Sequence, residues 1–343
     1  MLSMTKFRNF TSTGLRLTKI WILIFALLMA AKNGWAEEIK KEEVVTQKGL
    51  SMKVETFNDQ VFFVTVRIET QTDRGISVGT GFVIEREIDK DKRILFLVTN
   101  KHVIKGAKSG TFFFIKSDGT GPLLGEKYDI GVENFEASWY GHSDADTDVA
   151  IMPLGPILNE ISKKGWKIFF RSIPMNMFPS DQEVSELDAV EQVLFVGYPS
   201  GIFDGKNHLP IVRKGTTATP VMVDYNGHPH FLIDASVFGG SSGSPVFSGG
   251  GAFKSARNGG IILGGNKPLL LGLVSGTFSR RENGKIEFIQ IPTELAPVFQ
   301  YEQLLNLGLV VKSKAIVETV DAWLKQNNIQ VAGKQTEMPT AAS

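Results

Sequence analysis

Ser242 lies in a glycine-rich stretch from Gly239 to Ser244 that separates two short apolar runs. Apolar runs of this length predict buried strands, and glycine allows the loop between them to adopt backbone angles that other residues avoid. Such a loop can expose Ser242 Oγ while the N–H groups of Gly240 and Ser242 converge on one point. Donors fixed at that point stabilise the oxyanion that forms when a serine attacks a carbonyl. The alternative interpretation is the turn of an ordinary β-hairpin.

Two further residues bear on this choice. A serine hydroxyl is a poor nucleophile at neutral pH, so it needs a base, and the base needs a partner that fixes its tautomer. His102 follows the apolar run from Leu95, and we predict a strand that ends on this histidine. Asp148 opens an apolar strand that reaches Leu154. The order His102, Asp148, Ser242 therefore supplies a base, its partner and a nucleophile.

Three segments around these residues resemble the signatures of trypsin-fold serine peptidases. The nearest resemblance is to the cysteine-free bacterial branch, which includes glutamyl endopeptidases and periplasmic heat-shock proteases. The three segments are Thr-Asn-Lys-His-Val at 99–103, Asp-Val-Ala-Ile at 148–151 and Gly-Ser-Ser-Gly-Ser-Pro at 240–245. Gly-Thr-Gly-Phe at 79–82 and Gly-Tyr-Pro at 197–199 add support, and the similarity covers about residues 57–291.

The resemblance implies roles for the residues. Ser242 is the expected nucleophile, in preference to Ser241 and Ser244, and His102 is the expected general base. Asp148 is preferred over the neighbouring Asp144 and Asp146, which we interpret as solvated loop charges. The amides of Gly240 and Ser242 are the expected oxyanion hole.

The resemblance also implies a substrate site. Ser275 matches the residue whose hydroxyl supports the aspartate in the family. Val274, Ser275, Gly276 and Thr277 match the strand edge that pairs with the substrate backbone. Ser236 lies where the family places the base of the specificity pocket. Since Ser236 is not an aspartate and Val274 stands where glutamyl members have a histidine, we expect an uncharged P1 residue.

The other histidines, His142, His208, His228 and His230, have no matching partner in the sequence. His228 and His230 could face the same side, but two ligands make an incomplete metal site. We therefore predict neither a metal nor a cofactor.

The N-terminus predicts export. Basic residues precede an apolar run at 20–31, and small residues lead up to Ala36. This is the pattern of a signal peptide at 1–36, and the alternative is an uncleaved anchor. The run has 12 residues, whereas a spanning helix needs about 20. We expect cleavage after Ala36, no stable membrane anchor, and a location in the bacterial periplasm or outside the cell.

Composition fits this interpretation. The chain has 343 residues, no cysteine and a formal net charge of +1. Without cysteine the exported protein can form no disulfide, so its core alone must stabilise it. Zinc sites with thiolate ligands are also excluded. The charge gives no indication of nucleic acid as a partner. The expected partner is a protein or peptide substrate, and the sequence names no activator.

The fold class that we predict is all-β, with two six-stranded Greek-key barrels and a C-terminal helix. Short β-branched and aromatic runs separated by turn residues support the strands, and the barrels are implied by the family resemblance. We expect a lead-in at 37–56 and a peptidase domain at 57–300, with barrels at about 57–160 and 190–292. His102 and Asp148 then lie in one half and Ser242 in the other, so the site falls in the cleft between them.

Individual segments give further expectations. The first strand should cover 61–68, and one strand of the second half should cover 215–223. Residues 249–268, rich in glycine, predict either a mobile surface loop or a flap beside the cleft. Residues 301–343 should hold a helix capped by Ser313, packed on the second barrel, and a frayed tail. No room remains for an appended peptide-binding domain of about 90 residues.

The function that follows is an exported serine endopeptidase that works through an acyl-enzyme. The alternative is a trypsin-fold protein that is catalytically silent, or one that stays closed until a partner activates it.

Overall fold

The computed structural model describes residues 52–249, 253–255, 261–263, 267–280, 286–290 and 303–332. The predicted export signal, most of the lead-in, most of the glycine-rich segment 249–268 and the tail after residue 332 lie outside these residues. The described residues belong to one unit, 51–343. Within them, no helix combines the length and apolar character needed to cross a membrane.

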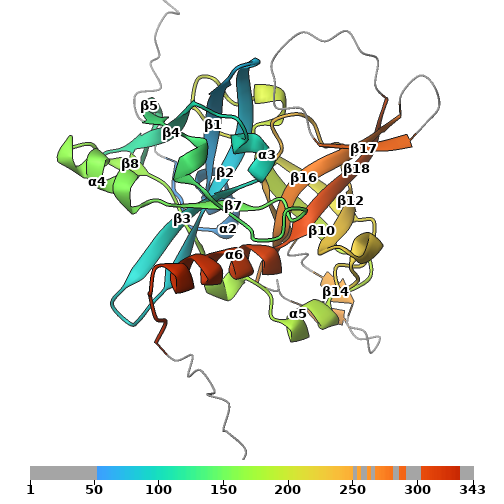
Figure 1. Ribbon diagram of the computed structural model, residues 1–343. Coiled ribbons are helices and arrows are strands. Elements are labelled where there is room, and N and C mark those ends of the chain that lie inside the picture. The colour runs from blue at the N-terminus through green and yellow to red at the C-terminus, as the bar shows by residue number, and fades with distance from the viewer. Residues whose placement is uncertain are drawn as a thin grey trace, which may run out of the picture. The chain divides into compact units, whose positions relative to one another are not determined.

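The first half of the chain forms a nine-stranded sheet (Figure 1). Its order is β5-β4-β1-β2-β3-β7-β6, with β8 paired to β4 and β9 paired to β2. The strands are β1 (Thr65–Thr72), β2 (Gly75–Glu87), β3 (Arg93–Thr99), β4 (Ser109–Ser117), β5 (Pro122–Glu133), β6 (Tyr140–Gly141), β7 (Ala150–Pro153), β8 (Ile168–Phe169) and β9 (Ile173–Pro174).

The second half forms a closed barrel. Its order is β13-β10-β11-β12-β18-β16-β17, and β13 also pairs with β16, so six strands close on themselves and β17 adds to the outside. The strands are β10 (Gln192–Gly197), β11 (Ile211–Thr217), β12 (His230–Asp234), β13 (Pro245–Ser248), β16 (Leu270–Arg280), β17 (Ile286–Gln290) and β18 (Gln303–Lys312). A separate pair consists of β14 (Phe253–Ser255) and β15 (Ile261–Leu263).

In the described residues, five α-helices connect or cover the strands. They are α2 (Phe57–Gln60), α3 (Lys101–Ile104), α4 (Gly155–Lys163), α5 (Asp181–Glu186) and α6 (Ser313–Gln326). The predicted fold class, an all-β double barrel with a C-terminal helix, is confirmed. The first half differs in detail, because it has nine strands instead of six and the described pairings do not close it.

Three predicted elements have different bounds. The strand expected at 61–68 begins only at Thr65, because Thr56 and Asp59 form a capping box that starts helix α2, and a 3₁₀ turn follows over Val61–Phe63. The strand expected at 215–223 is β11, which ends at Thr217, ahead of Pro220, a residue with no N–H for strand pairing.

The third difference is strand β18, in the segment that we assigned to the C-terminal helix and tail. It pairs with β12 on one side and β16 on the other, so it is central to the barrel. Helix α6 therefore begins at Ser313 with Lys312 as its N-cap residue, and no side chain caps it. The predicted Ser313 cap is wrong.

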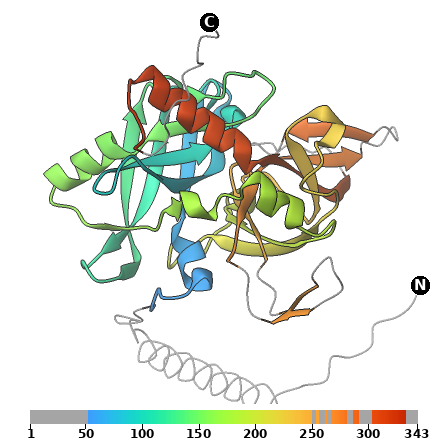
Figure 2. The same ribbon diagram turned by 90° about the horizontal axis from the view of Figure 1, so that it is seen from below.

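The core explains how the halves are joined. One buried cluster belongs to the first half and another to the second, while a third combines residues of both halves with helix α6. Figure 2 shows α6 across the two halves. Trp323 of α6 packs edge-on against Phe96 of β3 at 5.1 Å, and Arg86 of β2 pairs with Asp321 at 2.9 Å. Helix α6 therefore packs against both halves, whereas we had predicted packing on the second barrel.

Candidate active site

We predicted that His102 ends a strand. In the structure it lies in the first turn of helix α3 instead. Strand β3 stops at Thr99, and Asn100 takes the N-cap position with an extended backbone. Helix α3 packs closely against β2. Gly79 has no side chain at this contact, and a Cβ atom added there would lie only 2.5 Å from Val103 Cγ1. The turn after β3 therefore delivers His102 to the face between the two halves.

Asp148 lies two residues before β7, at the end of a loop that other side chains hold in place. Asn100 Nδ2 donates to the Asp148 backbone carbonyl at 2.7 Å. Lys101 Nζ donates to the carbonyl of Asp144 at 2.6 Å. Asp144 and Asp146 are exposed, as expected, and Asp148 is 9% exposed.

The three predicted catalytic residues form one chain of contacts. His102 Nδ1 lies 2.6 Å from Asp148 Oδ2, and His102 Nε2 lies 2.8 Å from Ser242 Oγ. The Ser275 hydroxyl donates to Asp148 Oδ2 at 2.6 Å, and the His102 N–H donates to Asp148 Oδ1 at 3.1 Å. With Nδ1–H directed at the carboxylate, the lone pair of Nε2 faces the serine hydroxyl.

The charge of the carboxylate is stabilised in place. Burial by itself would raise the pKa of Asp148, but the hydrogen bonds from His102 and Ser275, together with the charge of the imidazole, outweigh it and lower that pKa. Asp148 therefore stays ionised at neutral pH.

The serine loop depends on two glycines with positive φ. A Cβ atom at Gly240 (φ +78°) would lie 2.2 Å from the Tyr198 carbonyl oxygen. At Gly243 (φ +83°) it would lie 1.9 Å from the carbonyl oxygen of Thr80. The flanking strands β12 and β13 are not paired with each other. The hairpin alternative is therefore wrong.

Two carbonyl groups of the serine loop are held by hydrogen bonds from other segments. The N–H of Ser200 donates to the Gly239 carbonyl, and the Thr80 hydroxyl donates to the Gly240 carbonyl at 2.9 Å. Neither the Gly240 N–H nor the Ser242 N–H donates to any group among the described residues. The predicted oxyanion-hole amides therefore have no acceptor within the described chain.

The predicted substrate edge is largely occupied by the chain itself. Val274 uses both backbone groups on the serine loop, donating to Ser244 and accepting from Gly243 at 2.9 Å each. Gly276 and Thr277 pair with Gln290 and Ile289 of β17, while β18 pairs on their other side. Three of the four residues predicted to pair with the substrate backbone are thus bonded or paired to other parts of the chain in this structure. Within the described chain, Ser275 is the one residue of these four with neither a strand partner on this side nor a backbone bond to the serine loop.

Ser236, the predicted pocket base, is half-buried between β12 and β13, and no side-chain hydrogen bond from it is present in the described residues. Two residues later, Phe238 is 37% exposed and lies 4.8 Å from the Arg213 guanidinium carbon.

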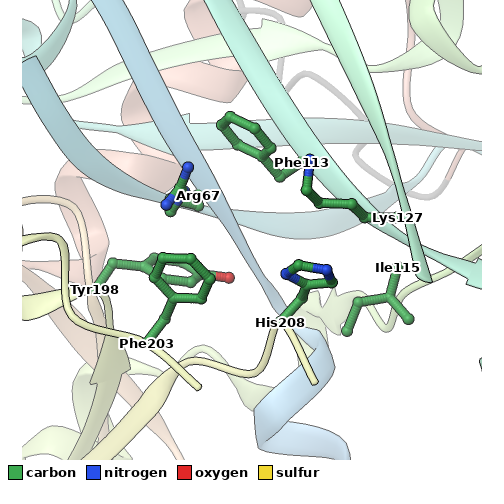
Figure 3. Close-up of a pocket in the computed structure, with 7 residues that line it drawn as sticks. All are labelled: Arg67, Phe113, Ile115, Lys127, Tyr198, Phe203 and His208. Atoms are coloured by element: carbon green, nitrogen blue, oxygen red, sulfur yellow. The ribbon is translucent and has the colours of Figure 1, made fainter. Parts of the chain in front are cut away.

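A pocket lies between strands β1, β4 and β5 and the loop after β10 (Figure 3). There the Arg67 guanidinium of β1 lies 4.1 Å from the ring centroid of Phe113 and 4.4 Å from that of Phe203. Tyr198 borders the same pocket, and burial raises its pKa to about 12, so the phenol stays neutral. This cation–π contact anchors the loop after β10, which supports Gly239 and Gly240, to the first half of the chain.

None of the other histidine side chains hydrogen-bonds to His102, Asp148 or Ser242 in the described chain. His142 contacts Glu318 of α6 at 3.3 Å, and His208 borders the pocket of Figure 3. The rings of His228 and His230 lie 5.9 Å apart. Within the described part of the chain, no group of three or more His, Cys, Asp or Glu side chains is arranged to hold a metal.

Sequence reasoning missed three residues that support the site: Thr80, Asn100 and Ser200. Thr80 gave a signal, because a threonine between two glycines packs where backbones approach closely. Asn100 and Ser200 gave none, since their roles depend on tertiary contacts.

Comparison with known proteins gives one family. The model of the trypsin-like peptidase domain matches residues 79–253, slightly more than half of the chain. No curated protein is significantly similar to the chain.

Among solved structures, the HtrA-type protease AlgW with a tripeptide is 15% identical, with a TM-score of 0.41 over 78% of this chain and 62% of that chain. A serine endoprotease from Yersinia pestis is 15% identical, with a TM-score of 0.41 over 80% of this chain and 69% of that chain. HL collagenase is 14% identical, with a TM-score of 0.40 over 82% of this chain and 97% of that chain. The chain spans less than two thirds of the length of the AlgW structure.

Proposed function

The chain belongs to the trypsin-like peptidase family, and we propose that it is an exported serine endopeptidase with Ser242, His102 and Asp148 as its catalytic triad. One observation carries the proposal. A continuous series of contacts, 2.6 to 2.8 Å long, links Ser242 Oγ to His102, His102 to Asp148, and Asp148 to Ser275. A catalytically silent relative would be expected to lack one of these groups.

The proposed mechanism needs only the residues of this chain. His102 Nε2 takes the proton from Ser242 Oγ as the oxygen attacks the substrate carbonyl, and the Gly240 and Ser242 amides stabilise the tetrahedral oxyanion. His102 then gives this proton to the leaving amine. A water molecule, deprotonated by His102, attacks the acyl-serine ester and releases the second product.

Hydrolysis of casein by purified residues 37–343 tests the proposal. We expect Ser242→Ala to lower kcat by at least about 10⁴-fold. Ser241→Ala is the matched control: its Oγ is buried without a hydrogen-bond partner in the described residues, so its loss leaves the loop's bonds intact. If Ser242→Ala hydrolysed casein as fast as an active parent, Ser242 would not be the nucleophile.

The preference for an uncharged P1 residue is part of the proposal. It rests on Ser236 and Val274, which supply no charge where the family carries its charged specificity residues. Mass spectrometric mapping of cleavage sites in a peptide library checks it, and a profile dominated by Arg, Lys or Glu at P1 would exclude it.

Export is likewise proposed, from the basic, apolar and small-residue pattern of residues 1–36. Cleavage would leave the lead-in 37–56 ahead of the peptidase domain, which begins at 57 in this proposal. Strand β18 and helix α6 extend this domain past residue 300. Mass spectrometry of the protein from a bacterial periplasm should give Glu37 as the N-terminus. An intact Met1 on membrane-bound protein would favour the uncleaved anchor.

A second candidate function, a peptidase closed until it is activated, is favoured by strand β17. Pairing of β17 with Gly276 and Thr277 occupies the edge on which a substrate backbone would add as a strand. Peptides would bind only when β17 leaves this edge, whereas a small reagent could still reach Ser242.

Ile289→Pro tests this candidate, because proline lacks the N–H for strand pairing. If β17 closes the site, the variant should hydrolyse peptides faster than the parent, while its labelling by a small fluorophosphonate stays unchanged. Peptide hydrolysis no faster than that of the parent would exclude closure by β17.

A further inference from the structure

Thr80 of β2 is a fully buried threonine whose hydroxyl lies between two loops of the other half. It accepts a hydrogen bond from the Tyr198 N–H at 3.2 Å and donates one to the Gly240 carbonyl at 2.9 Å. These are the loop after β10 and the serine loop. One side chain of the first half therefore ties together two backbone segments of the second.

The main chain of Thr80 also contacts the serine loop. Its N–H donates to the Ser242 carbonyl at 2.9 Å, and its own carbonyl accepts from Thr99 Oγ1 at 2.7 Å. The missing side chain of Gly243 leaves room for this carbonyl. Because Thr80 is fixed on both backbone groups, its hydroxyl is held in a defined place relative to Ser242.

The bond to the Gly240 carbonyl matters because of where that peptide group lies. The Gly240–Ser241 peptide lies between the two peptide groups that carry the Gly240 and Ser242 amides, those of the proposed oxyanion hole. Its carbonyl is held by Thr80 and its N–H by the Phe238 carbonyl, so rotation of this central peptide, which would turn the two amides relative to each other, is restrained. Preorganised donors of this kind stabilise a transition state because they need no reorganisation during the reaction.

We propose that the Thr80 hydroxyl is a positioning residue that aligns the oxyanion hole from the opposite half of the molecule. This inference rests on the proposed function. It predicts that loss of the hydroxyl lowers kcat and leaves KM little changed, because the oxyanion forms only in the transition state.

Thr80→Val removes the hydroxyl and keeps the shape of the side chain. We expect kcat for peptide hydrolysis, and the rate constant for fluorophosphonate labelling, to fall on the order of 10- to 100-fold. The pH midpoint of kcat/KM should not change, because the triad contacts do not involve Thr80. Thr80→Ser should restore most of the rate.

Thr70→Val is the matched control on the adjacent strand β1. Thr70 is 2% exposed, and its hydroxyl has no hydrogen-bond partner within the described residues, so the same substitution there should leave kcat within about twofold. If Thr80→Val does not fold, Thr80→Ala removes the hydroxyl without filling its space and carries the same expectation.

Three results would overturn the inference alone. The first is a parent-like kcat in Thr80→Val or Thr80→Ala, and the second is a Thr80→Ser variant as slow as Thr80→Val. The third is a shifted pH midpoint, since it would place the effect on the proposed triad. A parent protein that neither hydrolyses peptides nor reacts with the fluorophosphonate would overturn the proposed function, and this inference with it.

Discussion

Asp148 combines burial with ionisation, and the reason lies in its partners. A buried carboxylate would ordinarily become protonated more easily, yet two hydrogen bonds from His102 and one from Ser275 lower its pKa. In the proposed mechanism this charge stabilises the imidazolium that forms during attack.

Asp148→Asn tests that role at the residue scale. An amide keeps the shape but lacks the charge, and its NH₂ group can turn His102 to the wrong tautomer, so we expect kcat to fall by about 10³- to 10⁴-fold. Asp146→Asn, the same change on an exposed side chain two residues away, is the control. Steady-state kinetics that give similar values for both variants would show that Asp148 has no special role.

The lowered pKa of Asp148 also predicts how stability depends on pH. Because the carboxyl has a lower pKa in the folded than in the unfolded chain, its contribution is fully present above the unfolded value of about 4 and is lost as the pH falls through the folded value. The parent should therefore lose free energy of unfolding more steeply below about pH 4 than Asp148→Asn. Urea unfolding at several pH values measures this, and parallel curves would contradict it.

At the scale of elements, the short β-branched and aromatic runs between turn residues correctly predicted an all-β chain. The prediction failed where local pattern and tertiary context disagree. Residues 303–312 fell in the C-terminal segment 301–343, for which we predicted only a helix capped by Ser313 and a tail, whereas they form strand β18 between β12 and β16. The turn that carries His102 was missed because its apolar residues, Val103 and Ile104, continue the hydrophobic run of β3.

Helix α6 was predicted from the spacing of its apolar residues, and its contribution can be measured. Leu324 is 2% exposed and belongs to the cluster that both halves share. Leu324→Ala should lower the free energy of unfolding by about 2 to 5 kcal/mol, because it leaves a cavity in this cluster. Lys325→Ala, on the exposed side of the same turn, should change it by less than about 0.5 kcal/mol. Equal effects in chemical denaturation would mean that α6 does not pack as described.

At the scale of the molecule, the family resemblance anticipated that the triad is divided between two halves, with His102 and Asp148 in the first and Ser242 in the second. The sequence could not indicate how the halves are held in register. The structure does this through the shared cluster beneath α6, the contacts of Thr80, and the Arg67–Phe203 contact shown in Figure 3. Each of these contacts joins residues that are more than 100 positions apart.

The shared cluster predicts that the halves unfold together. Trp139 and Trp166 report on the first half and Trp323 on the helix, so fluorescence should follow the same denaturant transition as far-ultraviolet circular dichroism. Two separated transitions would show that the halves are independently stable, and that the site is not built on a single cooperative unit.

The most direct measurement of the central claim is fluorophosphonate labelling of purified residues 37–343, with Ser242→Ala and Ser241→Ala alongside. The reagent reacts with a serine that has both an active base and an oxyanion site, and it needs no strand pairing with β16. We expect the parent and Ser241→Ala to be labelled and Ser242→Ala to remain unlabelled. An unlabelled parent, or equal labelling of Ser242→Ala, would contradict the proposal that Ser242 is an activated nucleophile.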